Sequence, residues 1–183
     1  GEPGFPPPPE VVAAVAGAVA AGATHYTDSR GLYPLREAIS ADCRVRRGVD
    51  VGPERVLVTG GTSAALMMVC SLLLDPGDEV IVPAVTFVAT PNVVLHNRMT
   101  PVLVDVEREF YGIDPNLIES AITERTRAII PVHVFGQACD MDPVLELAKR
   151  HDLKVIEDSC ECMFARYKGR SVGSLGDIGC FST

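Results

Sequence analysis

The stretch RAIIPVHVFGQACDMDPVLELAKRHDLKVIEDS, residues 127–159, contains a complete strand–helix–strand unit. Its apolar runs at 127–134 and 153–159 have the length of strands, and residues 142–151 between them have the apolar spacing of a helix. Each run is continuously apolar rather than alternating, which indicates a strand buried on both faces. Two such strands joined by one helix predict a parallel sheet with a right-handed crossover.

The same alternation precedes this unit in the chain. Three further apolar segments of strand length are RVLVTG at 55–60, EVIVPA at 79–84 and PVLVDV at 101–106. A helical segment at 63–74 follows the first of them, and another at 116–122 separates the third from the unit at 127–159. The pattern predicts an α/β fold of three layers, α/β/α, around a mainly parallel sheet.

The first fifty residues follow another pattern. Four consecutive prolines in GEPGFPPPPE, residues 1–10, remove backbone donors and fix an extended chain, so this segment is expected to be an arm. The Ala-rich run at 10–21 and the segment from Pro34 to about residue 46 predict two short helices. We therefore expect an N-terminal arm with helices at 1–50 and a large sheet domain at 51–183.

Composition excludes several classes of protein. Hydrophobic residues make up 47% of the 183 residues, which is enough for a core, and the net charge of -8 argues against a broad surface for nucleic acid or anionic membrane. No stretch approaches the roughly 20 apolar residues of a membrane span, and the first residues lack the features of a signal peptide, so a cytoplasmic protein is expected. The six cysteines have no framework spacing and are expected to be reduced. Cys160-x-Cys162 lacks a second ligand pair, so no metal site is expected.

Two carboxylates, Glu157 and Asp158, directly follow the apolar residues of a predicted strand. A buried acid is costly unless a partner compensates its charge. In parallel α/β sheets, ligands bind beyond the carboxyl ends of the strands, which is where both acids are expected. His133 in PVHVFG has the same kind of position, but a strand-end histidine is more often satisfied by the backbone.

Neighbouring strand ends supply other groups. TGGTSAAL, residues 59–66, joins a strand to a helix through a Gly-rich turn, and its backbone N–H groups with Thr62 and Ser63 suit a phosphate. Phe87 offers a flat face to a ring. Taken singly, these residues have ordinary interpretations as a capped turn and a core side chain, and Asp158 as an N-cap. Taken together, an anion site, a stacking face and an acid for a ring nitrogen predict pyridoxal phosphate.

The segments GDEVIVPAVTFVAT, PVLVDV and YKGRSVGSLGDIGCFST, with the strand–helix–strand unit, resemble sugar aminotransferases of the DegT/DnrJ/StrS type from about residue 54 to 183. The opening, with GEPGFPPPP and THYTDSRG, resembles aspartate-aminotransferase-type enzymes of the same fold type I. This resemblance implies the large domain of a pyridoxal-phosphate-dependent transferase of fold type I. It also implies transfer of an amino group, commonly from glutamate, to a keto group of a nucleotide-linked sugar, with pyridoxal 5'-phosphate or pyridoxamine 5'-phosphate as cofactor.

The resemblance also implies roles for single residues. Phosphate contacts come from Thr62, Ser63 and Ser182. Phe87 stacks on the ring, and Asp158 meets its nitrogen. Tyr26 reaches the phosphate of a neighbouring subunit's cofactor, which implies a homodimer. The candidate catalytic residues are Asp158 and Glu161.

The chain departs from the family pattern in two ways. The Schiff-base lysine of the family lies a few residues beyond the FS serine, whereas this chain stops at Thr183, so we expect the front part of an enzyme that is inactive alone. Glu161 stands where most of these aminotransferases have Gln or His. An acid there resembles the 3-dehydratases of the family, which act on a nucleotide-linked 4-ketosugar with pyridoxamine phosphate. A non-catalytic binding or dimerising domain of the same fold remains a third alternative.

Overall fold

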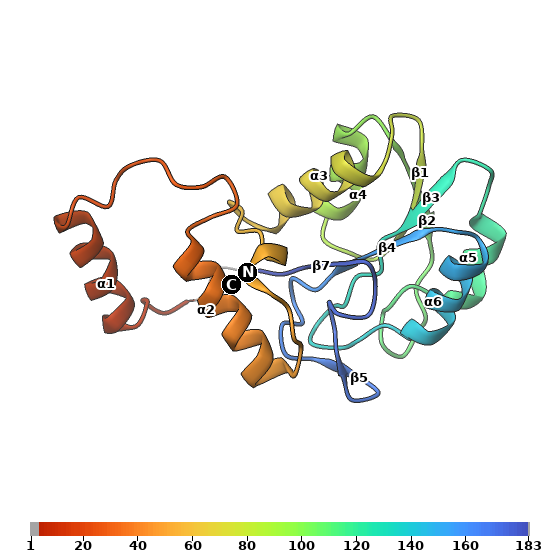
Figure 1. Cartoon of the computed structure of the whole chain (residues 1–183). Helices are drawn as coiled ribbons and strands as arrows, with labels where there is room; N and C mark the ends of the chain where they lie inside the picture. The colour runs from red at the N-terminus through yellow and green to blue at the C-terminus, as the bar shows by residue number, and fades with distance from the viewer. Residues whose placement is uncertain (1–3, 183) are drawn as a thin grey trace.

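The computed structural model describes residues 4–182, so residues 1–3 of the predicted arm and Thr183 lie outside the described part. Within these residues a parallel sheet of five strands lies between two layers of helices (Figure 1). The strand order is β2-β1-β3-β4-β7. Its strands are β1 Glu79–Pro83, β2 Thr100–Val104, β3 Thr126–Ile129, β4 Lys154–Asp158 and β7 Ile178–Cys180.

Helices cover both faces of this sheet, which confirms the predicted three layers. The helices α3 Thr62–Leu73 and α4 Ala89–His96 share one apolar core with one face, and α5 Pro115–Ala121 and α6 Met141–Arg150 share a second core with the other. Successive strand residues point to opposite faces, so Val80 packs toward α3 and α4 while Ile81 packs toward α5 and α6. The continuously apolar segments are therefore needed to fill two cores at once.

The strand predicted at 55–60 is wrong. Residues 56–59 are irregular, Leu57 is exposed, and the N–H of Val58 donates to the carbonyl of Arg30 instead of a sheet partner. Beside β4 lies β7, a three-residue strand that the sequence did not predict. A Cβ at Gly179 would collide with the backbone of Gly173, so the absence of a side chain permits this close packing.

A short hairpin turns at Lys168 and Gly169. β5 Arg166–Tyr167 and β6 Arg170–Ser171 pair antiparallel, and both turn residues have positive φ, 48° and 83°. This is the backbone of a two-residue hairpin turn.

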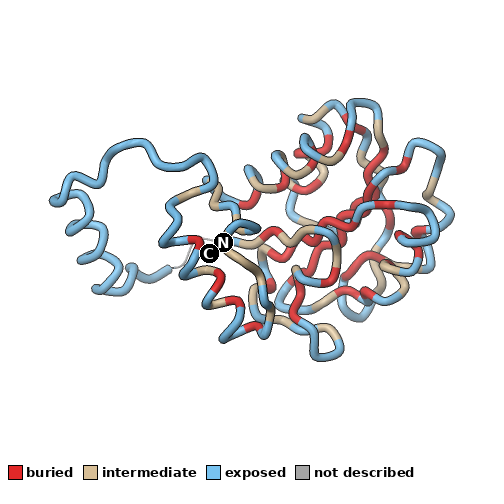
Figure 2. Tube along the Cα trace, in the orientation of Figure 1, coloured by how far each residue is buried: buried red, intermediate tan, exposed pale blue. Residues whose placement is uncertain are grey.

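The N-terminal region contains both predicted helices. The helix α1 Pro9–Ala20 stands apart from the sheet in Figure 1, and Figure 2 shows it exposed along its whole length. The helix α2 Tyr33–Asp42 continues into a π-helical turn, Cys43–Arg47, and a short 3-10 turn follows at Pro53–Arg55. Arg36 fixes α2 to the body of the protein because its guanidinium donates to the carbonyls of Gly31 and Pro53.

Two further properties concern residues 4–182. None of their helices is both long enough and apolar enough to cross a membrane. All six cysteines are free, as predicted; five are buried and Cys160 is partly exposed.

Candidate active site

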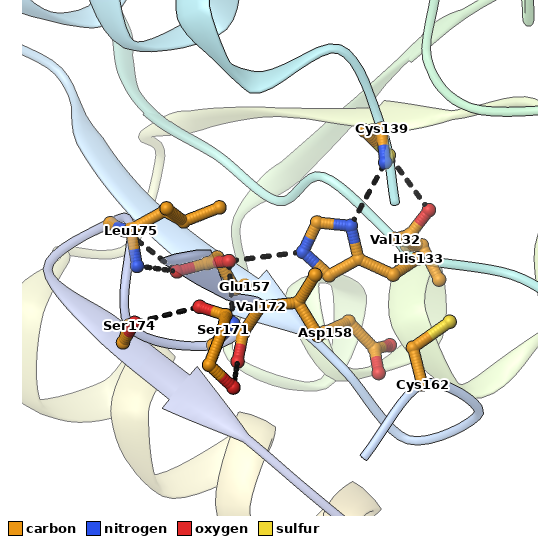
Figure 3. A network of polar contacts seen from close by, with 12 residues as sticks. Val132, His133, Cys139, Glu157, Asp158, Cys162, Ser171, Val172, Ser174 and Leu175 are labelled. Atoms are coloured by element: carbon orange, nitrogen blue, oxygen red, sulfur yellow. Dashed lines mark hydrogen bonds and ion pairs between the residues drawn. The ribbon is translucent and has the colours of Figure 1, made fainter. Parts of the chain in front are cut away.

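Glu157 and Asp158 end β4 side by side, and the strand sends them to different surroundings. Glu157 is completely buried and accepts the backbone N–H groups of Gly173, Leu175 and Gly176 at 2.6–2.7 Å (Figure 3). Asp158 instead lines a pocket at the carboxyl edge of the sheet. Glu157 therefore holds the surrounding chain together, whereas Asp158 is available to a ligand.

His133 is the fourth partner of Glu157. Its Nδ1 accepts the N–H of Cys139 at 3.1 Å, so the ring proton is on Nε2, which donates to Glu157 at 3.0 Å (Figure 3). Burial by itself would raise the pKa of Glu157, but the hydrogen bonds from His133, Gly176 and Gly173 outweigh it and the pKa lies below its ordinary value. The prediction that the backbone satisfies His133 is confirmed, with Glu157 as a second partner.

The pocket beside Asp158 has a volume of about 240 Å³. It lies where ligands bind in parallel α/β sheets, beyond the carboxyl ends of β1, β3 and β4. It brings together six of the residues predicted from the sequence, namely Thr62, Ser63, Phe87, Asp158, Glu161 and Ser182.

Asp158 is a buried carboxylate whose partners in the pocket are all neutral. Thr90 donates its hydroxyl to Oδ2 at 2.9 Å, and Cys160 donates its backbone N–H and its thiol to Oδ1. None of the lysines, arginines and histidines within residues 4–182 forms an ion pair with it. Burial and the hydrogen bond to Asp158 raise the pKa of Cys160 to about 12, so this side chain stays a thiol and a donor. A cationic group on a ligand is the natural complement of such a carboxylate.

Sequence reasoning missed Thr90. Its side chain is almost fully buried in the first turn of α4, and its hydroxyl lies 3.3 Å from that of Thr86. The available signal was the pair of threonines four residues apart on either side of Phe87, at the start of a helix that follows a strand. The structure places Thr86 just before α4 and Thr90 in its first turn.

The other end of the pocket suits an anion. The helix α3 has twelve residues and begins at Thr62, beside the pocket. No side chain caps its first turn, so its first backbone N–H groups and the positive end of the helix dipole are directed to the pocket. The hydroxyl of Thr62 donates to the carbonyl of Phe181 at 2.9 Å. Ser63 and Ser182 also line the pocket with their hydroxyl groups, whereas the hydroxyl of Thr62 is used inside the protein.

The remaining predicted residues differ in position. The Phe87 ring is 70% exposed at the pocket mouth, so it is not a core side chain. Glu161 lines the rim, and its Oε2 accepts the N–H of Phe135 at 3.1 Å. Tyr26 is fully exposed between α1 and α2, and it is not among the residues that line the pocket.

Comparison with known proteins gives a consistent picture. The profile of the DegT/DnrJ/EryC1/StrS aminotransferase family matches residues 52–183. GDP-perosamine synthase of Caulobacter vibrioides is 47% identical over 153 residues, which are 84% of this chain and 39% of that protein. UDP-N-acetyl-3-dehydro-alpha-D-glucosamine 3-aminotransferase of Acidithiobacillus ferrooxidans is 51% identical over 122 residues, 67% of this chain and 33% of that protein.

The fold is also that of solved aminotransferases. The aminotransferase from Psychrobacter cryohalolentis superposes with a TM-score of 0.83 at 31% identity, over 98% of this chain and 44% of that chain. This chain thus spans less than half the length of the relatives and of the structure that it matches.

Proposed function

The chain belongs to the DegT/DnrJ/EryC1/StrS aminotransferase family, and from this premise we propose that it is the cofactor-binding part of a pyridoxal-phosphate-dependent aminotransferase. The observation that carries the proposal is Asp158, a buried carboxylate that has only neutral hydrogen-bond donors and opens into a pocket. A protonated ring nitrogen would balance the negative charge of this carboxylate.

The residues of the pocket fit pyridoxal 5'-phosphate, and its amino form, at three points. Asp158 would hold the ring nitrogen in its protonated form. Phe87, at the mouth, would lie against the ring, and the start of α3 with Ser63 and Ser182 would hold the phosphate. When bound, the cofactor supplies an electron sink for amino-group transfer.

The proposed acceptor is a keto group on a nucleotide-linked sugar, and the proposed amino donor is glutamate. The names of the two relatives, a GDP-perosamine synthase and a 3-aminotransferase of a UDP-linked 3-dehydro sugar, support this acceptor. Glu161 supports a second candidate, a pyridoxamine-phosphate-dependent 3-dehydratase of a nucleotide-linked 4-ketosugar, because its carboxylate lies at the pocket rim. Incubating a full-length version of the protein with glutamate and such a ketosugar distinguishes the two, since the first yields an aminosugar and the second a dehydrated sugar.

The N-terminal region, residues 1–50, is proposed to act between subunits. Tyr26 is exposed on the connection from α1 to α2, where a side chain is available to a second copy. We assign it to the phosphate of the partner subunit's cofactor in a homodimer, with residues 51–183 forming the cofactor-binding domain. The expected cytoplasmic location stays a prediction.

Substitution of Asp158 by asparagine tests the proposal. The protein carrying Asp158→Asn is expected to bind pyridoxal 5'-phosphate about ten to a hundred times more weakly, because a charge-assisted hydrogen bond contributes roughly 1.5–3 kcal/mol. The measurement is equilibrium dialysis, with far-ultraviolet circular dichroism to follow the fold. Asp152→Asn is the matched control, since Asp152 is exposed just before the other end of β4. Unchanged affinity in Asp158→Asn, with both variants folded, contradicts the proposed site.

A further inference from the structure

Two aromatic side chains at the edge of the candidate site have no packing role. Tyr111 and Phe135 are 50% and 76% exposed, and neither belongs to the two apolar cores. Their ring centroids lie 6.5 Å apart with an interplanar angle of 82°, an edge-to-face pair. Two rings paired in this way beside a pocket offer a stacking surface to a ligand.

The pair is built from two separate loops at the carboxyl edge of the sheet. Tyr111 lies in the loop after β2, which the bridge between Val106 and Ile113 closes, and Phe135 lies in the loop after β3. Both residues have left-handed backbone, with φ of 59° and 54°. That conformation is unfavourable for bulky side chains, so the surrounding structure must hold both rings in place.

Phe135 contacts a residue that lines the pocket. Its N–H donates to Oε2 of Glu161 at 3.1 Å, and Glu161 lines the pocket beside Asp158. A molecule whose reacting end enters the pocket would therefore pass Glu161 before its far end meets the aromatic pair.

We propose that Tyr111 and Phe135 form a subsite for the nucleobase of a nucleotide-linked substrate, an inference that rests on the proposed function. Every nucleobase offers a flat face that stacks on an aromatic ring, and such stacking is effective in water. Gln137, two residues after Phe135, is exposed and its amide offers both a donor and an acceptor to a base edge.

Charge assigns the base, rather than the diphosphate, to this rim. The segment between β2 and α5 that carries Tyr111 contains four carboxylates, Asp105, Glu107, Glu109 and Asp114, against one arginine, Arg108. These carboxylates would repel a diphosphate, whereas an uncharged base is compatible with them.

The test measures binding of UDP, GDP and inorganic pyrophosphate by isothermal titration calorimetry, with and without pyridoxal 5'-phosphate. Phe135→Leu and Tyr111→Leu remove a ring but keep apolar volume, and each should weaken nucleoside diphosphate binding at least about tenfold. Tyr111→Phe keeps the ring and should stay within about twofold of the original protein. Phe110→Leu is the matched control, because Phe110 is equally exposed in the same loop but is not part of the pair.

The subsite would be overturned if nucleoside diphosphates bound no more tightly than pyrophosphate, or if Phe110→Leu weakened their binding as much as Phe135→Leu does. It would also be overturned if the main effect of Phe135→Leu were weaker self-association in sedimentation. The last outcome would assign the rings to a contact between copies. Pyridoxal 5'-phosphate binding is recorded for every variant and should be unchanged. If the unmodified protein did not bind pyridoxal 5'-phosphate, the proposed function would be contradicted. The difference in affinity between nucleoside diphosphates and pyrophosphate tests the subsite independently of the cofactor.

Discussion

The carboxylate of Asp158 is held by two side chains, one distant in sequence and one close to it. Thr90 comes from α4, sixty-eight positions away, and Cys160 follows two positions later in the chain. Both are neutral, so they orient the carboxylate without cancelling its charge. A carboxylate held in this way is prepared for a cationic ligand, because its orientation is already set before binding.

Replacing Thr90 by valine tests this arrangement at nearly constant volume. Oδ2 of Asp158 would lose its hydroxyl donor, and loss of a hydrogen bond to a buried charged group costs about 1.5–3 kcal/mol. We expect Thr90→Val to weaken pyridoxal 5'-phosphate binding about tenfold in a fluorescence titration. Thr90→Ser keeps the hydroxyl and should recover most of the affinity. Equal affinities for the valine and serine variants would show that the hydroxyl does not matter.

Glu157 connects three pieces of chain that the sequence keeps apart. It belongs to β4, His133 to the connection that follows β3, and the N–H groups of Gly173, Leu175 and Gly176 to the loop before β7 (Figure 3). Glu157 thus fixes both loops to the end of β4, next to Asp158. The rigidity of the pocket is therefore expected to depend on a carboxylate that does not line it.

Glu157→Gln is expected to lower the free energy of unfolding at neutral pH by at least about 1.5–3 kcal/mol, because the hydrogen bonds to a buried carboxylate become weaker bonds to a neutral amide. The amide NH₂ would also face backbone N–H groups that need an acceptor. Urea denaturation measures the change. Glu124→Gln, at an exposed position, is the control and should change stability by less than about 0.5 kcal/mol. A Glu157→Gln value as small as that of the control would contradict this role.

The same carboxylate gives stability a dependence on pH. Its pKa in the folded protein lies below the ordinary value of 4.5, so the folded protein holds the ionised form more strongly than the unfolded chain does. This contribution is complete above pH 4.5 and is lost as the pH falls through the folded-state pKa. Urea denaturation in that acid range should show a weaker pH dependence for Glu157→Gln than for the unmodified protein.

Taken as one body, the protein leaves its N-terminal helix uncovered. Val11, Val12, Val15 and Val19 of α1 are each at least half exposed, and no residue of α1 is buried (Figure 2). An Ala- and Val-rich helix of twelve residues gains little from propensity alone, so packing must supply its stability. Exposed apolar surface of this kind promotes association.

We expect the 183-residue protein to associate at micromolar concentration in sedimentation velocity. The double variant Val15→Lys with Val19→Lys should shift it toward monomer, because charges on α1 cannot be buried in a contact. Val45→Lys is the control, since Val45 is highly exposed but lies in the π-helical turn after α2. A compact monomer for the unmodified protein would contradict the prediction.

Much of the candidate site could be predicted from local sequence. Ser63 and Asp158 each directly follow a glycine-rich turn or an apolar run, and the topology of a parallel sheet then brings such strand ends to one edge. Thr90 could not be assigned in this way, because its partner is sixty-eight residues away and only the packing of α4 against the sheet brings the two together. The error at 55–60 has a similar origin, because an apolar run of strand length joins a sheet only where a partner strand is available, and here Val58 bonds the backbone of Arg30 while β7 pairs with β4.

The sequence alone determined the α/β class and the three layers, because the apolar period and the alternation of strand and helix follow from local patterns, and it predicted the sheet edge at which we place the site. The sequence could not show which of the neighbouring acids Glu157 and Asp158 is enclosed and which lines the pocket. The tertiary structure decided that one is enclosed by His133 and a loop while the other opens into a pocket. The physical reason is that adjacent residues of a strand face opposite sides of the sheet, and what lies on each side is supplied by distant parts of the chain.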